Sequence, residues 1–285
     1  MPNSPAGSGR WSSRTVANLL VAVAALYALL PLVWLLMAST VDRQSLFASD
    51  FFDPKNFALL DNLRALLDEG DGIFLRWYGN SLLYAVLGAG LGALISVAAG
   101  YAFEKYEFAG KRQLFALVLV SVMVPATVLA LPLYLMVSGV HLANTVWSVF
   151  VPVLFNPFGV YLGRLFAASY VPGEVLEAAR VDGADELRTF LSVGLRMMAP
   201  GYVTIFLFQL TAIWNNFFLP LVMLNDEKLY PLSLGLYSWN AAAPIVPDYY
   251  PLMVIGSLLA LLPLVIAFVL LQRFWKSGLT AGSVK

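Results

Sequence analysis

Residues 171–200 are the longest charged, helix-forming segment in an otherwise apolar sequence, and a soluble partner could contact them. Glu177 and Arg180, three residues apart, share one face of an expected helix and are expected to form an ion pair. Gly183 supplies a tight or left-handed turn, and Asp182 or Asp185 can cap the helix that follows. That second helix has apolar residues at helical spacing: Leu187, Phe190, Leu191 and Leu195. The segment is therefore expected to be a bent pair of amphipathic helices that a soluble protein could contact.

The other reactive residues do not form a recognisable catalytic or metal-binding site. The chain has no cysteine and a single histidine, His141, which argues against disulfides, thiolate catalysis and a metal site. Gly110-Lys111 lacks both the upstream glycine and the trailing Ser or Thr of a phosphate-binding loop. We therefore expect no enzyme activity and no cofactor, with any ATP and Mg²⁺ bound by partner chains. Zero net charge without a basic cluster argues against a nucleic-acid partner.

Neutral polar and aromatic side chains lie within the apolar stretches, where hydrogen bonds and ring stacking would suit an uncharged solute such as a sugar. In membrane helices Asn and Gln also bond to neighbouring helices, and Trp also anchors a helix at the interface. Both interpretations stay open for the candidates, which are Asn156, Gln209, Trp214, Asn215 and Asn216. The apolar cores hold no Asp, Glu, Lys, Arg or His, which disfavours an ion-coupled carrier.

The composition requires a membrane protein, since 60% of the 285 residues are hydrophobic and only 12% are charged. Runs of about twenty apolar residues predict six spans in an all-α integral membrane fold: 16–37, 81–103, 114–137, 142–165, 197–224 and 252–271. Pro125 and Pro132 should kink the third span. Gly88 and Gly92 should form a small-residue face for close helix packing in the second.

The expected domain organisation is a transmembrane domain of residues 15–275 between two tails, 1–14 and 276–285. The N-terminal tail is expected to be disordered. Loops 38–77 and 225–251 lie on one side, and loop 166–197 lies on the other. Twelve of the 17 Lys and Arg residues fall on the side of the termini and loop 166–197. The positive-inside rule therefore places both termini and that loop in the cytoplasm.

The order Glu177-Ala178-Ala179, Asp182-Gly183-Ala184, Phe190 and Pro200 resembles the cytoplasmic coupling loop, or EAA loop, of permease subunits in binding-protein-dependent ABC importers. The Trp214-Asn215 pair and the ending GLTAGSVK resemble the carbohydrate-uptake branch, typified by the smaller maltose-system permease. One departure is Leu195-Arg196, where this family usually has Leu-Pro, although Pro200 offers a later stop for the helix.

The resemblance implies a type I ABC importer permease fold in a bacterial or archaeal inner or plasma membrane. It implies three partners: a second homologous permease, a cytoplasmic ATPase dimer and an extracytoplasmic sugar-binding protein. ATPase coupling would fall to Glu177, Ala178, Ala179, Asp182, Gly183, Ala184 and Phe190. Tyr237 and Trp239 would contact the binding protein, although a loop supported by its own aromatic residues is an equal alternative. Most sugar contacts would belong to the paired permease.

The sequence therefore favours one half of an ATP-driven import pathway for a sugar, a di- or oligosaccharide. Three alternatives remain: a permease for another polar solute such as a glycerol phosphate, a membrane scaffold that transports nothing, and, for residues 171–200, an amphipathic helix lying on the membrane surface. An anionic solute would favour Lys or Arg along the path, and the span cores have none.

Overall fold

The apolar stretches fold into helices in the computed structural model, which describes residues 9–42, 46 and 56–281. Within that part the only β pairing is an isolated antiparallel bridge between Val41 and Phe57. Four helices are long and apolar enough to cross a membrane, and there are up to six spans if each of two bent helix pairs counts as one. The expected all-α membrane fold is confirmed, and the number of spans reaches the expected six when each bent pair is counted as one.

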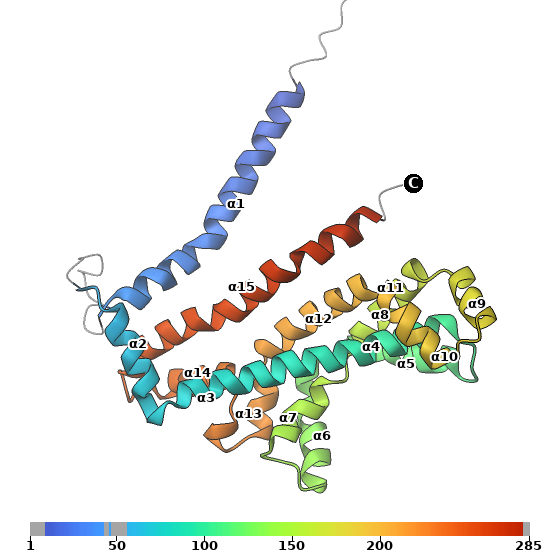
Figure 1. Ribbon diagram of the computed structural model, residues 1–285. Coiled ribbons are helices and arrows are strands. Elements are labelled where there is room, and N and C mark those ends of the chain that lie inside the picture. Colours follow the sequence, from blue (N-terminus) through green and yellow to red (C-terminus); the bar gives the residue numbers. More distant parts are fainter. Residues whose placement is uncertain (1–8, 43–45, 47–55, 282–285) are drawn as a thin grey trace, which may run out of the picture.

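A 33-residue helical run from Ile73 to Lys105 crosses the molecule (Figure 1). It consists of α3 (Ile73–Leu82), the π-helical turn η4 (Leu83–Leu87) and α4 (Gly88–Lys105). Two further helices, α8 (Pro157–Tyr170) and α12 (Ala199–Trp214), pack against α4. These three packed helices form the centre of the fold.

Glycines let α4 approach its neighbours closely. A Cβ atom on Gly92 would overlap the Gln209 amide of α12, and one on Gly88 would lie 3.0 Å from a methyl group of Val153. The small-residue face predicted in this span is therefore confirmed. Gly100 serves the contact with α8, where a Cβ would overlap backbone atoms of Gly163 and Arg164.

Two long helices lie outside this centre. Helix α1 (Gly9–Thr40) is almost wholly exposed and contacts mainly α15 (Tyr249–Ala281) and α2 (Leu59–Asp68). Its apolar side chains are therefore left for lipid or another membrane protein. Both helices are longer than expected: α1 starts inside the tail 1–14, which corrects the predicted disorder from residue 9 onward, and α15 reaches six residues into the tail 276–285. Residues 1–8 and 282–285 lie outside the described part.

The third span is broken, not merely kinked. Helices α5 (Lys111–Met123) and α6 (Ala126–Gly139) meet at an angle of 110°. Val124 and Pro125 between them are extended, because proline disfavours a helical conformation in the residue before it and cannot donate a hydrogen bond. Pro132, in contrast, lies inside α6. The expectation of one kinked helix over 114–137 was wrong at Pro125.

The fourth and fifth spans differ from expectation at their ends. The fourth consists of α7 (Val146–Val153) and α8. The fifth ends at Trp214, and a short helix, α13 (Phe218–Met223), follows it, so the expected range 197–224 is too long. Before the fifth span the chain bends by 76° between Met197 and Ala199, and Pro200 lies in the first turn of α12. The helix preceding this bend stops before Pro200 is reached.

Short elements cover the two ends of the α3–α4 run (Figure 1). At one end lie α2, the 3₁₀ turns η3 (Glu69–Asp71) and η6 (Glu227–Leu229), and α14 (Leu232–Ala242). At the other lie α9 (Gly173–Val181), α10 (Glu186–Thr189), the π-helical turn η5 (Phe190–Gly194) and α11 (Leu195–Met197). The sequence places these two groups on opposite sides of the membrane, which agrees with their separation.

Candidate functional site: a helical coupling segment and the solute path

The segment from α9 to α11, which the sequence predicts to couple to an ATPase and which is called the coupling segment below, is the helix–turn–helix expected from the sequence. Gly183 has φ +77°, the left-handed conformation that glycine adopts most readily. The Asp185 carboxylate accepts a hydrogen bond from the Arg188 backbone N–H at 2.7 Å and caps α10. Asp182 instead ends α9. The bent shape is thus set by residues that the sequence identifies.

The ion pair on this segment differs from expectation. Arg180 Nε donates to Glu186 Oε1 at 3.0 Å, across the turn, rather than to Glu177 on its own helix. This hydrogen bond raises the pKa of Arg180 above its ordinary value. Glu177 remains exposed on α9, next to exposed Ala178. The predicted pairing of Glu177 with Arg180 was therefore wrong, because the turn at Gly183 brings Glu186 back to α9.

The apolar residues of the segment divide between two faces. Val181 and Leu187 point outward with 87% and 68% of their surfaces exposed. Phe190 packs inward on Tyr101 of α4, and Leu176 is buried beside Val171 and Met198. The outward face, with Glu177 and Ala178 beside these apolar groups, has the mixed character of a protein-contact surface. The inward face fixes the segment to the membrane helices.

Three solute-path candidates make hydrogen bonds between helices. Asn156 Nδ2 donates to Gln209 Oε1 at 3.1 Å, and Gln209 Nε2 donates to the Val153 carbonyl at 2.7 Å. The Asn156 carboxamide oxygen also accepts from the Gly159 backbone N–H and caps α8. Trp214 is buried, and its indole N–H donates to the Ala260 carbonyl of α15. In this structure the polar groups of these three residues join helices to one another.

Asn215 and Asn216 lie just after the end of α12. Asn215 is exposed, bonds back to the Thr211 carbonyl, and lines a groove of about 490 Å³ between α12 and α15. Asn216 accepts from the Leu219 backbone N–H, and its carbonyl accepts from the Ser233 hydroxyl. Of the five candidates, Asn215 is the one most open to a solute.

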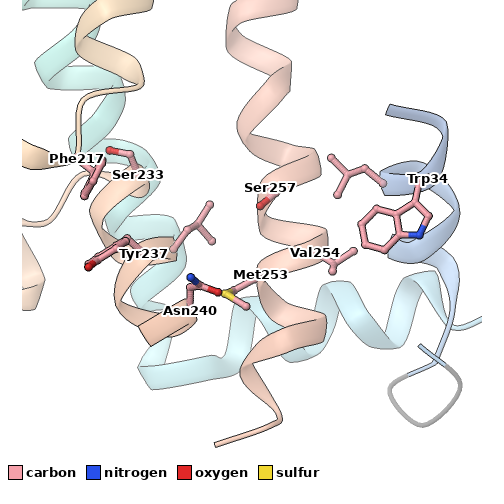
Figure 2. Close-up of a pocket in the computed structure, with 10 residues that line it drawn as sticks. Trp34, Phe217, Ser233, Tyr237, Asn240, Met253, Val254 and Ser257 are labelled. Atoms are coloured by element: carbon pink, nitrogen blue, oxygen red, sulfur yellow. The ribbon is translucent and has the colours of Figure 1, made fainter. Parts of the chain in front are cut away.

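A second groove, of about 460 Å³, runs along α14 and α15 toward α1. Figure 2 shows Ser233, Tyr237 and Asn240 of α14 beside Ser257 of α15, with Trp34 on the far side of α15. None of the ten lining residues is charged. Except for Tyr237, sequence analysis missed these residues, although Ser233, Tyr237 and Asn240 recur at helical spacing within loop 225–251.

The two residues expected to touch a binding protein behave differently. Trp239 is only 5% exposed, and its ring lies 4.8 Å from that of Trp77 and 5.6 Å from that of Tyr249. Its predicted outward contact is therefore corrected: Trp239 supports loop 225–251 from within. Tyr237 is 42% exposed and remains available.

Side chains of α3 hold the same loop by its backbone. Trp77 Nε1 donates to the Glu227 carbonyl at 2.7 Å, and the Ser81 hydroxyl accepts from the Leu232 N–H at 2.7 Å. Asn80 Nδ2 donates to the carbonyls of Lys228 and Tyr230. The side chains of Asp226, Glu227 and Lys228 thus stand exposed on a fixed turn, which could not be foreseen from the loop's own sequence.

Residues 88–280 match the family described as the binding-protein-dependent transport system inner membrane component. The chain belongs to this family. The arabinooligosaccharides transport system permease protein of Halalkalibacterium halodurans is 33% identical over 267 residues, which cover 92% of each chain. The maltodextrin transport system permease protein of Bacillus subtilis is 28% identical, with 98% of this chain and 99% of that one covered.

The permease fold also has a solved counterpart. A bacterial ABC transporter involved in the import of the acidic polysaccharide alginate has a chain that matches with a TM-score of 0.79 and 22% identity, over 96% of this chain and 99% of that chain. The expected resemblance to sugar-branch permeases and to their fold is confirmed. The permease is a multi-pass inner-membrane protein, and the family match includes α4, α8, α12 and the coupling segment.

Proposed function

We propose that this permease forms half of the translocation pathway of an ABC importer for a neutral di- or oligosaccharide. A separate ATPase dimer, which binds ATP and Mg²⁺, would drive it through the coupling segment. The observation that carries the proposal is the coupling segment itself. It combines an outward face of mixed character, centred on Glu177 to Ala184, with an inward face packed on α4. The permease itself would bind no cofactor.

The partners follow from the surfaces that the permease leaves open. The exposed α1 and the two grooves beside α15, one shared with α12 and one with α14, would meet the second permease, which completes the pathway. An extracytoplasmic sugar-binding protein would dock at the other end, on Tyr237 and the fixed turn of Asp226 to Lys228. Both termini and the coupling segment would face the cytoplasm, in agreement with the Lys and Arg distribution.

Two observations support a sugar over a glycerol phosphate. Relatives that align over nearly the whole chain are named for arabinooligosaccharides, lactose and maltodextrin. The residues that line the two grooves include Asn215, Ser233, Asn240 and Ser257 and no charged side chain. Neutral hydrogen-bonding groups beside aromatic rings suit hydroxyl groups, whereas a phosphate would need Arg or Lys.

The experiment is reconstitution of the permease with its second permease, ATPase and binding protein in lipid vesicles. Arabinooligosaccharide or maltodextrin bound to the binding protein should raise ATP hydrolysis and drive uptake, and glycerol 3-phosphate should do neither. Stimulation by glycerol 3-phosphate alone would refute the solute class. Failure of the ATPase to bind the permease would favour the scaffold alternative.

A further inference from the structure

Tyr101 lies at the inner end of α4, one turn before that helix stops, and is only 1% exposed. Its ring centroid is 5.0 Å from that of Phe190 in the coupling segment and 5.6 Å from that of Tyr106, which follows α4. The Phe190 ring is tilted by 52° and the Tyr106 ring by 83° relative to Tyr101. One α4 side chain therefore lies between the coupling segment and the chain that leaves the helix.

Gly194 of the coupling segment also lies against the Tyr101 ring. A Cβ atom added to Gly194 would lie 2.8 Å from the Tyr101 ring, so that position accepts the ring only because it has no side chain. The π-helical turn η5 begins with Phe190 and ends with Gly194, which places both against the same ring. Tyr101 is thus enclosed by the coupling segment, and a rotation of that segment must displace the ring.

A polar contact runs beside the aromatic one. Glu186 accepts a hydrogen bond from Arg180 at 3.0 Å. Burial raises the pKa of Tyr106, and its contacts with Tyr101 and Glu186 raise it further. Glu186 therefore interacts with Arg180 of α9 and also with Tyr106, the residue that follows α4.

Hydrogen bonding at this junction is incomplete. Among the described residues, two buried side-chain oxygens make no hydrogen bond of acceptable geometry, the hydroxyls of Tyr101 and Thr189. The Tyr106 hydroxyl is the polar neighbour of the first, and Thr189 directly precedes Phe190 in the chain. Tyr101 therefore contacts the coupling segment through its ring, and its hydroxyl adds no hydrogen bond to this junction.

We propose that Tyr101 is the positioning residue through which the coupling segment moves α4. The inference rests on the proposed ATP-driven function. The segment, displaced by an ATPase, would press Phe190 and Gly194 against the ring. Because packed side chains deform little, α4 would then shift with its partners α8 and α12. The ring transmits the displacement, and the hydroxyl is not required.

Three variants in the reconstituted complex test this proposal. Tyr101→Ala should lower the sugar taken up per ATP hydrolysed about tenfold, while ATPase binding persists. Tyr101→Phe should keep the wild-type ratio, because it retains the ring and removes a hydroxyl without a hydrogen bond. The matched control is Phe74→Ala, which removes an equally buried aromatic ring from the same helical run, far from the coupling segment. It should reduce the amount of complex without changing uptake per ATP.

If Tyr101→Ala prevents assembly, Gly194→Ala provides the decisive measurement. Its added methyl group would push the Tyr101 ring while every other side chain is kept. Gly194→Ala should also lower the sugar taken up per ATP hydrolysed. The double variant Gly194→Ala/Tyr101→Leu should recover part of that lost uptake. A wild-type ratio in either Tyr101→Ala or Gly194→Ala would overturn the proposal. If sugar does not stimulate ATP hydrolysis in the wild-type complex, the proposed function itself is refuted.

Discussion

Gly183→Val should reduce ATP-driven sugar uptake about tenfold while the amount of permease in the membrane stays the same. Gly183 has φ +77° and no atom within 4 Å of an added Cβ, so the substitution strains the backbone without a packing clash. A left-handed conformation costs a residue with a Cβ about 1–2 kcal/mol, and a β-branched residue is especially ill-suited to it. The turn would relax to another shape and rotate α10 away from α9.

The matched control is Gly173→Val in the same segment. Gly173 begins α9, has an ordinary φ, and also has no atom within 4 Å of an added Cβ. Uptake and sugar-stimulated ATP hydrolysis, measured together in vesicles, should be near wild type for Gly173→Val. For Gly183→Val, hydrolysis should continue without uptake. Normal transport by Gly183→Val would show that the shape of this turn does not matter for coupling.

Gly100→Ala should cause the largest loss of stability in the permease. The added methyl group would overlap the backbone of α8 at Gly163 and Arg164 and would lie 2.7 Å from the Gly163 Cα. Backbone cannot move aside as a side chain can, so α4 and α8 must separate along their contact. Overpacking of this kind costs about 1–3 kcal/mol or more. We expect a lower melting temperature and less assembled complex in detergent.

Gly79→Ala lies in the same helical run and serves as the control. Gly79 is exposed and has no atom within 4 Å of an added Cβ, and alanine favours a helix over glycine by about 1 kcal/mol. The Gly79→Ala permease should melt at the wild-type temperature or slightly above it. Equal melting temperatures for Gly79→Ala and Gly100→Ala would contradict the close α4–α8 contact.

The coupling segment shows how far local sequence reasoning reaches. The left-handed Gly183 and the Asp185 cap could be predicted because each depends only on nearby backbone. The ion pair could not, because the choice of Glu186 over Glu177 depends on the angle at which α10 leaves the turn. The inward and outward apolar residues of the segment could not be separated either, since Phe190 and Leu187 differ only in what packs on them.

The membrane helices show the same limit. Pro125 breaks its span whereas Pro132, seven residues later, lies inside a helix, and the local sequence does not distinguish the two.

Gln209 and Trp239 have side chains that suit both packing and binding. Gln209 is held by Asn156 and Val153, which come from other helices, and Trp239 by Trp77 and Tyr249. Only these tertiary contacts show that both side chains serve packing in this structure.

We expect a separate ATPase to bind the coupling segment on the cytoplasmic side, and thiol labelling tests this directly. The chain has no cysteine, so Val181→Cys and Ile245→Cys each introduce a single thiol, at positions that are 87% and 85% exposed. In the permease without ATPase, the thiol at 181 should react with a membrane-impermeant maleimide only from the cytoplasmic side. The thiol at 245 should react only from the opposite side. Binding of the ATPase should protect position 181 and leave 245 reactive. Reaction of the thiol at 181 from outside, or equal reactivity with the ATPase bound, would show that the ATPase does not bind this segment from the cytoplasm.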